Sequence, residues 1–418
     1  MKVFKFGGAS VKDAEGVKNV VRVLQETKAT DVVIVISAMG KMTNALEGVV
    51  GTYFEDTSSS KVSSQILLEY HYPILDQLFG NKSHPVYKEV ASLATLLVNF
   101  LDTNRSKNHS FVYDQVVCYG ELISTTIVSA YLSEIGMENT FLDVRSCIIT
   151  DDNYRDAKVD WEHTQQKILQ QVTTKGITIT QGFLGSEKGY NFTTTLGREG
   201  SDYTAAIFAY CLNADSVTIW KDVPGVLNAD PRYFSKTTLL HNISYREAIE
   251  LAFYGASVIH PKTLQPLQRK EIPLFVKSFL NPLAAGTCVG KGVALNPAVS
   301  CFILKRNLVL ISLSSLDFNF MMEHHIRDVF QWLSDYKMKV ELIQNSAISF
   351  SVCVDNKYDN LEPLLTKLRA SFKVKWNENV TLYTIRHATA KQVKSIVKDK
   401  TLLLKQESRE TVQLVVKE

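Results

Sequence analysis

The sequence contains few cysteines, and their spacing does not suggest a disulfide framework or a zinc site. Its 418 residues include six cysteines, and no two of them form a Cys-x-x-Cys pair. Cysteines scattered in this way are typical of reduced thiols in a cytoplasmic protein. We therefore expect all six to be free: Cys118, Cys147, Cys211, Cys288, Cys301 and Cys353.

Other features that are absent exclude further classes of protein. The net charge is only +3, and the basic residues are dispersed, so no nucleic-acid surface is expected. The longest apolar runs, such as 32–36, have the length of a strand and predict no membrane span. The first residues, MKVFKFGG, lack the apolar core of a cleaved signal peptide. No GxxxxGK[ST] phosphate-binding loop occurs, so a site for a phosphate must be built in another way.

The length and the pattern of the chain predict two or three domains with an α/β architecture. Apolar runs of strand length alternate with amphipathic segments, which indicates a largely parallel central sheet. Two long helical stretches, 62–79 and 85–103, interrupt this alternation. The strands are expected at 32–37, 115–118, 140–144, 177–183 and 216–220.

The N-terminal segment has the pattern of an anion site. Residues 3–6 alternate as a strand does, Gly7 and Gly8 follow, and a helical pattern starts near Val11. Glycines let the backbone approach a ligand, and helix N-termini present N–H groups to anions. Lys5 adds a cation that can follow the charge of a phosphoryl group. An ordinary Gly-Gly turn of an α/β domain is the alternative.

Two further segments place polar groups beside predicted strands. Ser37 to Asn44 directly follows a strand, at the end where open α/β sheets bind ligands. Ser37 or Thr43 could instead cap the next helix. Glu121 follows the strand predicted at 115–118, and it could simply interact with a helix dipole.

An ordered set of motifs over residues 1–290 resembles the aspartate kinases of the amino-acid kinase superfamily. Lys5-Phe6-Gly7-Gly8-Ala9-Ser10 opens the series, and Gly255-Ala256-Ser257-Val258-Ile259-His260-Pro261 closes it. Between them lie 37–44, 120–124, 196–203, 221–225 and 229–232, in the order of the family. Any one of these motifs could occur by chance, but the ordered set is specific.

The resemblance implies a role for each of several residues. Glu121 would accept the α-ammonium group of aspartate, and Arg198 would grip its α-carboxylate in two parallel hydrogen bonds. Asp202 would lie beside the phosphoryl group in transfer, together with Lys5. Ser37, Thr43 and Ser201 complete the expected substrate site. The expected nucleotide site comprises Lys5, Gly7, Gly8, Lys221, Asp222, Arg232 and Ser257.

The chain departs from the family pattern at two places. Glu199 stands where relatives usually have glycine, so we expect ordinary backbone angles there and a side chain directed to solvent. Ser257 stands where many relatives have lysine, and Lys221 stands where they have threonine. We expect Lys221 to replace the missing cation, with Lys262 as the second choice. Alternatively, Lys221 is a solvated surface residue, and Arg232 with Mg²⁺ suffices.

The C-terminal part resembles ACT domains, which have the ferredoxin-like β-α-β-β-α-β order. We expect a catalytic domain at 1–295 with a helical insert at about 61–105, a first ACT-like domain at 296–378 and a second, short one at 379–418. The resemblance implies an amino-acid effector, lysine or threonine, near Ser346 and Ser349, and a homodimer or homotetramer. A purely structural dimerisation module is the alternative.

The sequence therefore predicts ATP-dependent phosphorylation of L-aspartate to 4-phospho-L-aspartate, with Mg²⁺ supplied as MgATP. Mg²⁺ keeps much of its water, so no protein metal ligand is predicted. This reaction opens the pathway to lysine, threonine and methionine. One alternative is a sister kinase that acts on glutamate, acetylglutamate or a nucleotide. Another is a catalytically silent amino-acid sensor, although the retention of Lys5, Glu121, Arg198 and Asp202 speaks against it.

Overall fold

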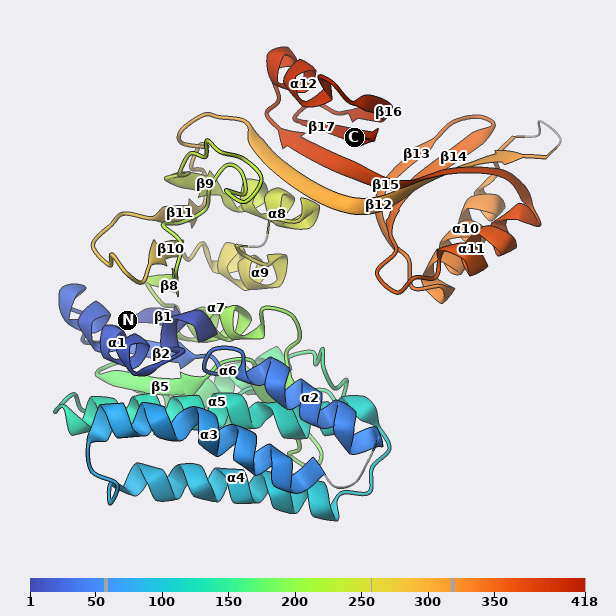
Figure 1. Ribbon diagram of the computed structural model, residues 1–418. Coiled ribbons are helices and arrows are strands. Elements are labelled where there is room, and N and C mark those ends of the chain that lie inside the picture. Colours follow the sequence, from blue (N-terminus) through green and yellow to red (C-terminus); the bar gives the residue numbers. More distant parts are fainter. Residues whose placement is uncertain (56–58, 257, 317–319, 418) are drawn as a thin grey trace. The chain divides into compact units, whose positions relative to one another are not determined.

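The computed structural model describes residues 1–55, 59–256, 258–316 and 320–417. The chain forms two compact units (Figure 1). The first comprises Met1–Val226, Leu239–Ile249 and Val258–Pro297, and the second comprises Leu227–Thr238, Glu250–Ser257 and Ala298–Glu418. Two segments of the expected catalytic domain, 227–238 and 250–257, therefore group with the C-terminal part of the chain.

The first unit is built on an eight-stranded sheet in the order β3-β5-β2-β1-β8-β10-β11-β9. All of its strand pairs are parallel except β10 with β11. This confirms the α/β class with a largely parallel sheet. The strands are β1 (Lys2–Phe6), β2 (Val32–Ile36), β3 (Asn139–Leu142), β5 (Ile177–Gln181), β8 (Ser216–Lys221), β9 (Asn242–Ser244), β10 (Leu274–Ser278) and β11 (Thr287–Gly290).

A smaller sheet, in the order β4-β6-β7, lies in the same unit. Its strands are β4 (Ile149–Thr150), β6 (Leu184–Glu187) and β7 (Thr193–Thr195). The helices of this unit are η1 (Gly8–Val11), α1 (Ala14–Glu26), α2 (Met42–Glu55), α3 (Ser59–Phe79), α4 (Pro85–Thr103), α5 (His109–Glu134), η2 (Val144–Ser146), α6 (Trp161–Gln171), α7 (Gly200–Leu212) and α9 (Pro261–Lys270). Helix α8 (Tyr245–Tyr254) continues from the first unit into the second.

The strand predicted at 115–118 is wrong, because these residues lie within the long helix α5. Val116, Val117 and Cys118 are all buried, and a helix that is apolar on every side has no amphipathic period that would distinguish it from a buried strand. Among the described residues, α5 is also the one helix long and apolar enough to cross a membrane. Two-thirds of its most apolar window (67%) is buried inside the protein, as in the core helix of a globular domain.

The two helices predicted at 62–79 and 85–103 are confirmed as α3 and α4. The first turn of α4 is capped by His84, whose Nδ1 accepts the backbone N–H of Val86. Hydrophobic residues of α3, α4 and α5 join those of β1, β2 and α1 in one core cluster. The expected insert is therefore packed into the core of the first unit.

The second unit contains a six-stranded antiparallel sheet in the order β13-β14-β12-β15-β17-β16. Its strands are β12 (Cys301–Ser315), β13 (Lys339–Asn345), β14 (Ser349–Asp355), β15 (Phe372–Arg386), β16 (Thr401–Glu407) and β17 (Thr411–Lys417). Its helices are α10 (Glu323–Asp335), α11 (Leu361–Arg369) and α12 (Ala390–Val397). The expected boundary at 378/379 falls inside β15. The start of β12, Cys301 to Lys305, pairs with Arg386 to Leu382 of β15, within the predicted second repeat.

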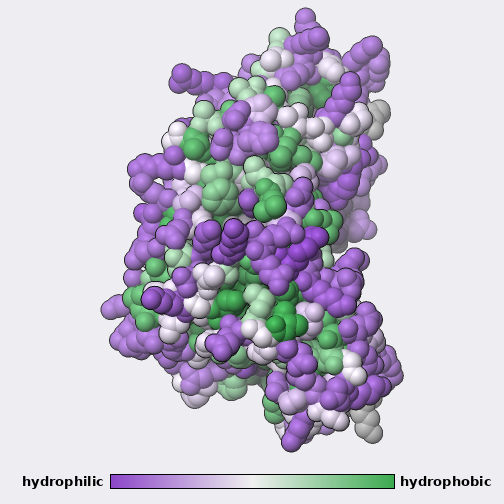
Figure 2. Space-filling view, turned by 90° about the vertical axis from the view of Figure 1, so that its left-hand side faces the viewer, coloured by the Kyte–Doolittle hydropathy of each residue, from purple (hydrophilic) through white to green (hydrophobic). Residues whose placement is uncertain are grey.

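Hydrophobic residues on the face shown in Figure 2 lie in small groups among hydrophilic ones. All six cysteines are free, and five of them are buried. Hydrophobic burial, and not covalent cross-linking, therefore stabilises the described part of the chain.

Candidate active site

A cleft of about 510 Å³ lies in the first unit and contains most of the predicted substrate residues. It is placed after strands β1 and β2, at the carboxyl edge of the sheet, where α/β proteins bind ligands. It is lined by Lys5, Gly8, Ser37, Ala38, Gly40, Thr43, Asn44, Tyr113, Glu121, Arg155, Phe183, Gly197, Arg198, Glu199, Gly200 and Ser201.

Two lysines share one buried carboxylate beside this cleft. The Nζ atom of Lys5 lies 2.7 Å from Oδ1 of Asp202, and the Nζ atom of Lys221 lies 3.6 Å from Oδ2. Lys221 also donates to the carbonyl oxygen of Val258 at 2.6 Å. Burial by itself would raise the pKa of Asp202, but the two ammonium groups outweigh it and hold that pKa below its usual value. Two cations against one anion leave a net positive charge, which suits a phosphoryl group.

Glu121 provides a nearly buried carboxylate on the cleft wall. Its Oε1 accepts the backbone N–H of Ala38 at 3.3 Å, whereas its Oε2 has no hydrogen-bond partner among the described residues. Burial raises the pKa of Glu121 to about 8. The expectation that it opens a helix after a strand is wrong, because it lies in the middle of α5. A buried carboxylate with one unsatisfied oxygen is suited to receive a cation.

Arg198 lies in the loop before α7, with an exposed side chain that forms no ion pair within the described parts of the chain. We expected ordinary backbone angles at the neighbouring Glu199, and this expectation is wrong, because its φ of 55° is left-handed. Its side chain is half-buried and lines the cleft, so it does not simply point to solvent. A left-handed angle is uncommon for a residue with a Cβ. A glycine would adopt this angle without that steric cost.

The glycine turn after β1 is closely packed. A Cβ on Gly8 would lie 2.7 Å from the carbonyl oxygen of Ala38 and 2.8 Å from that of Gly40, so no side chain fits there. Gly7 precedes the short helix η1, and the helix expected from near Val11 is confirmed as α1, which begins at Ala14. Ser37 and Thr43 both reach the cleft, and Ser201 lies in the first turn of α7. The segments that were expected to surround the substrate are thus adjacent.

Part of the predicted nucleotide site is not brought into this cleft. Asp222 is exposed after β8. Arg232 belongs to the second unit, where its guanidinium pairs with Asp230 at 2.5 Å. Lys262 pairs with Asp156 and also donates to the carbonyl of Leu196 at 3.1 Å. Ser257 lies outside the described residues.

Three residues that line the cleft lie outside every motif of the sequence analysis: Tyr113, Arg155 and Phe183. Asn44 also lines the cleft, and it ends the motif 37–44, although no role was assigned to it. Arg155 gave no such signal, because it reaches the cleft through contacts between segments far apart in the sequence.

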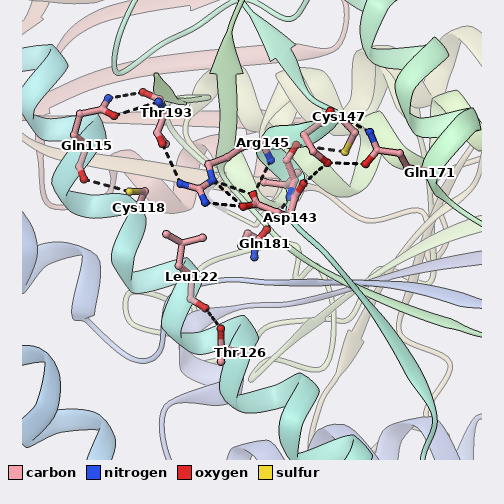
Figure 3. Close-up of polar contacts among 12 residues, drawn as sticks. Gln115, Cys118, Leu122, Thr126, Asp143, Arg145, Cys147, Gln171, Gln181 and Thr193 are labelled. Carbon is pink, nitrogen blue, oxygen red and sulfur yellow. Dashed lines mark hydrogen bonds and ion pairs between the residues drawn. The ribbon is translucent and has the colours of Figure 1, made fainter. Parts of the chain in front are cut away.

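Behind the cleft, a polar network holds β7 against α5 (Figure 3). The side chain of Gln115 pairs with both backbone groups of Thr193: it donates to the carbonyl at 2.7 Å and accepts the N–H at 3.2 Å. Arg145 binds Asp143 through two nitrogens, at 2.9 and 2.6 Å. Gln181 accepts the backbone N–H of Val144 at 2.8 Å. The bonds of Gln115, with one from Arg145 to the hydroxyl of Thr193 at 3.4 Å, fix the strand that leads into the Arg198 loop.

The described residues contain no group of three or more His, Cys, Asp or Glu side chains that could hold a metal ion. Ser346 and Ser349, predicted near an effector, flank the turn between β13 and β14, and their hydroxyls lie 2.7 Å apart. Their role in effector binding stays a prediction.

Comparison with known proteins extends the resemblance over the whole chain. Residues 1–278 match the amino acid kinase family. The chain is 34% identical over 408 residues to lysine-sensitive aspartokinase 3 of Escherichia coli (strain K12), which covers 92% of this chain and 86% of the relative. It is 30% identical to the chloroplastic aspartokinase 1 of Arabidopsis thaliana, over 84% of this chain and 63% of the relative.

Two solved structures of E. coli aspartokinase III are also similar to the chain, each at 30% identity and each covering 100% of this chain and 96% of the other. The complex with lysine and aspartate has a TM-score of 0.82. The complex with aspartate and ADP has a TM-score of 0.80.

Proposed function

Because this chain belongs to the aspartokinases of the amino acid kinase family, we propose that it transfers the γ-phosphoryl group of MgATP to the β-carboxylate of L-aspartate. The product is 4-phospho-L-aspartate, the first intermediate on the route to lysine, threonine and methionine. The observation that carries this assignment is Glu121, a buried carboxylate whose Oε2 has no hydrogen-bond partner among the residues that the structure describes. It lines the same cleft as Lys5 and as Arg198, which forms no ion pair in the described part of the chain.

The acceptor half of the cleft suits an amino acid with a second carboxylate. Glu121 receives the α-ammonium group, and Arg198 binds the α-carboxylate through two parallel hydrogen bonds. Ser37, Thr43 and Ser201 offer hydroxyls to the remaining oxygens. The β-carboxylate is ionised at neutral pH and needs no general base, so the transfer requires no catalytic histidine.

The part of the cleft in which the phosphoryl group is transferred depends on positively charged side chains. Lys5, held by Asp202, stabilises the charge that spreads over the phosphoryl oxygens, and the backbone of Gly7 and Gly8 lets the phosphates approach closely. Lys221 shares Asp202 with Lys5 and steadies the leaving phosphate. This favours the replacement of the missing family lysine by Lys221 over a surface role, and Lys262 is already paired with Asp156.

Asp222 completes the proposed nucleotide site of the first unit through the ribose or metal-bound water, and the role of Arg232 as a cation for the polyphosphate stays a prediction. In that role the exposed Arg232 exchanges its partly buried partner Asp230 for phosphate, which costs little for an exposed ion pair. Mg²⁺ arrives with ATP and neutralises phosphate charge while it keeps most of its own water.

We propose a regulatory role for the second unit. The E. coli relative is described as lysine-sensitive, and one of its solved structures contains lysine. An amino-acid effector at the turn of Ser346 and Ser349, and a cytoplasmic homodimer or homotetramer joined through this unit, follow from the family. Titration of the kinase activity with lysine, threonine and methionine tests the effector. If none of them inhibits, the unit is structural or recognises another ligand.

A coupled assay of ADP release tests the reaction itself. We expect release that depends on aspartate, with little turnover when aspartate is replaced by glutamate or omitted. Turnover with glutamate in place of aspartate would indicate a sister kinase. No acceptor-dependent turnover, together with retained binding of aspartate, would indicate a sensor without catalytic activity.

A further inference from the structure

Arg155 brings a second guanidinium into the acceptor cleft. Its side chain is about 40% exposed and lines the cleft together with Arg198. The guanidinium lies over the ring of Tyr113, 4.0 Å from the ring centroid, and one nitrogen lies 3.0 Å from Oε1 of Glu47. Tyr113 belongs to α5 and Glu47 to α2, so two helices of the cleft wall orient this cation.

The buried carboxylate of Asp114 binds the backbone of Arg155. Asp114 is fully buried, and both of its oxygens lie within 3.2 Å of the N–H of Arg155, which donates to them. It also accepts the N–H of Thr195 at 2.8 Å and the hydroxyl of Thr195 at 2.7 Å. Thr195 ends β7, directly before the loop of Arg198. The side chain of Asp114 therefore fixes both the segment that carries Arg155 and the strand that leads to Arg198.

The backbone of Arg155 is unusual in a way that these contacts explain. Its φ is 71°, in the left-handed region that residues with a Cβ rarely adopt. Such a conformation persists where the surroundings impose it. Here Asp114 binds the backbone, while Tyr113 and Glu47 bind the side chain.

We propose that Arg155 is a second substrate-binding cation, which strengthens the binding of the acceptor dicarboxylate, and that Asp114 is the positioning residue that presents it. This inference rests on the proposed function. Aspartate brings two carboxylates and one ammonium group. Glu121 balances the ammonium group and Arg198 one carboxylate, so the remaining negative charge favours another cation nearby. In the free protein the carboxylate of Glu47 pairs with the guanidinium of Arg155. A carboxylate of the bound substrate competes with Glu47 for this guanidinium.

The first test compares Arg155→Met with Arg105→Met. Arg105 is an exposed arginine whose guanidinium donates to the carbonyl oxygens of Asp102 and Asn104 and does not line the cleft. Loss of a partly exposed cation should raise the KM for aspartate about 3- to 30-fold, with little change in the KM for MgATP or in kcat. Arg155→Lys should recover part of the loss, and Arg105→Met should change none of these constants.

Glu47→Gln should change the KM for aspartate in the opposite direction, because it removes the carboxylate that competes with the substrate for Arg155. The KM for aspartate should fall or stay level. For Asp114, a double-mutant cycle separates positioning from general damage: Asp114→Asn should raise the KM for aspartate more in the wild-type background than in Arg155→Met. Thermal melting identifies any variant that fails to fold, and Arg155→Lys then serves in place of Arg155→Met.

An unchanged KM for aspartate in a folded Arg155→Met enzyme would overturn the inference, as would a rise in KM after Glu47→Gln. Additive effects of Asp114→Asn and Arg155→Met would remove the positioning role. Failure of the proposed function would be recognised separately, because the wild-type protein would then show no aspartate-dependent release of ADP.

Discussion

Binding of aspartate should release a proton from Glu121. Burial raises the pKa of this carboxyl to about 8 in the free protein, so at neutral pH most molecules carry a proton there. The ammonium group of aspartate favours the ionised carboxylate and must displace that proton. The site is therefore ready for its substrate only in the ionised fraction of the enzyme.

The fraction of enzyme in which Glu121 is ionised determines how strongly the pH changes the affinity for aspartate. With a pKa of about 8, the apparent Kd for aspartate should be weakened ~100-fold at pH 6, ~10-fold at pH 7 and ~2-fold at pH 8, relative to high pH. About 0.9 proton should leave per aspartate bound at pH 7. Isothermal titration calorimetry in buffers of different ionisation enthalpy measures the proton count, and titrations from pH 6 to 8.5 measure the change in Kd.

The same pKa shift has a consequence for stability. A raised pKa means that the folded protein binds this proton more tightly than the unfolded chain. The contribution of Glu121 is therefore most favourable below its ordinary pKa, 4.5, and is lost as the pH rises to about 8. Glu121→Gln is the matched control: it should bind aspartate weakly at every pH and should remove this part of the pH dependence of the melting temperature. A Kd that stays constant from pH 6 to 8.5, with no proton release, would refute the reasoning.

Three further predictions concern the charges of the cleft. Lys5→Ala should lower kcat by about 10²–10³, the cost of losing a preorganised charge donor, with little change in aspartate binding; steady-state kinetics decides this, and an active variant would contradict the assignment. Arg198→Ala should weaken aspartate binding, because a substrate carboxylate loses its partner, and should retain ATP binding; loss of ATP affinity alone would mean that the two halves of the cleft are reversed. Lys221→Thr should raise the KM for MgATP, and Ser257→Lys added to it should restore the use of MgATP; unchanged ATP kinetics in Lys221→Thr would end the idea of compensation.

The order of the motifs allowed much of this protein to be inferred from its sequence. Lys5, Gly8 and Arg198 could be assigned to one site because each lies in a short segment whose residue types are tied to its chemistry. The helices α3 and α4 could be predicted because their length and hydrophobic pattern are local properties. Helix α5 could not, because its buried residues face the core on every side and local periodicity is lost.

The tertiary structure alone decided the properties that depend on burial and on distant neighbours. Glu121 is a carboxyl with a raised pKa only because the middle of α5 lies inside the protein, and Asp202 serves two lysines only because β1, α7 and β8 meet. Asp114 joins α5 to two segments 41 and 81 residues away. A sequence records which side chains are available. Their distances, their shared partners and the water excluded around them arise when remote segments pack, and these determine charge and chemistry.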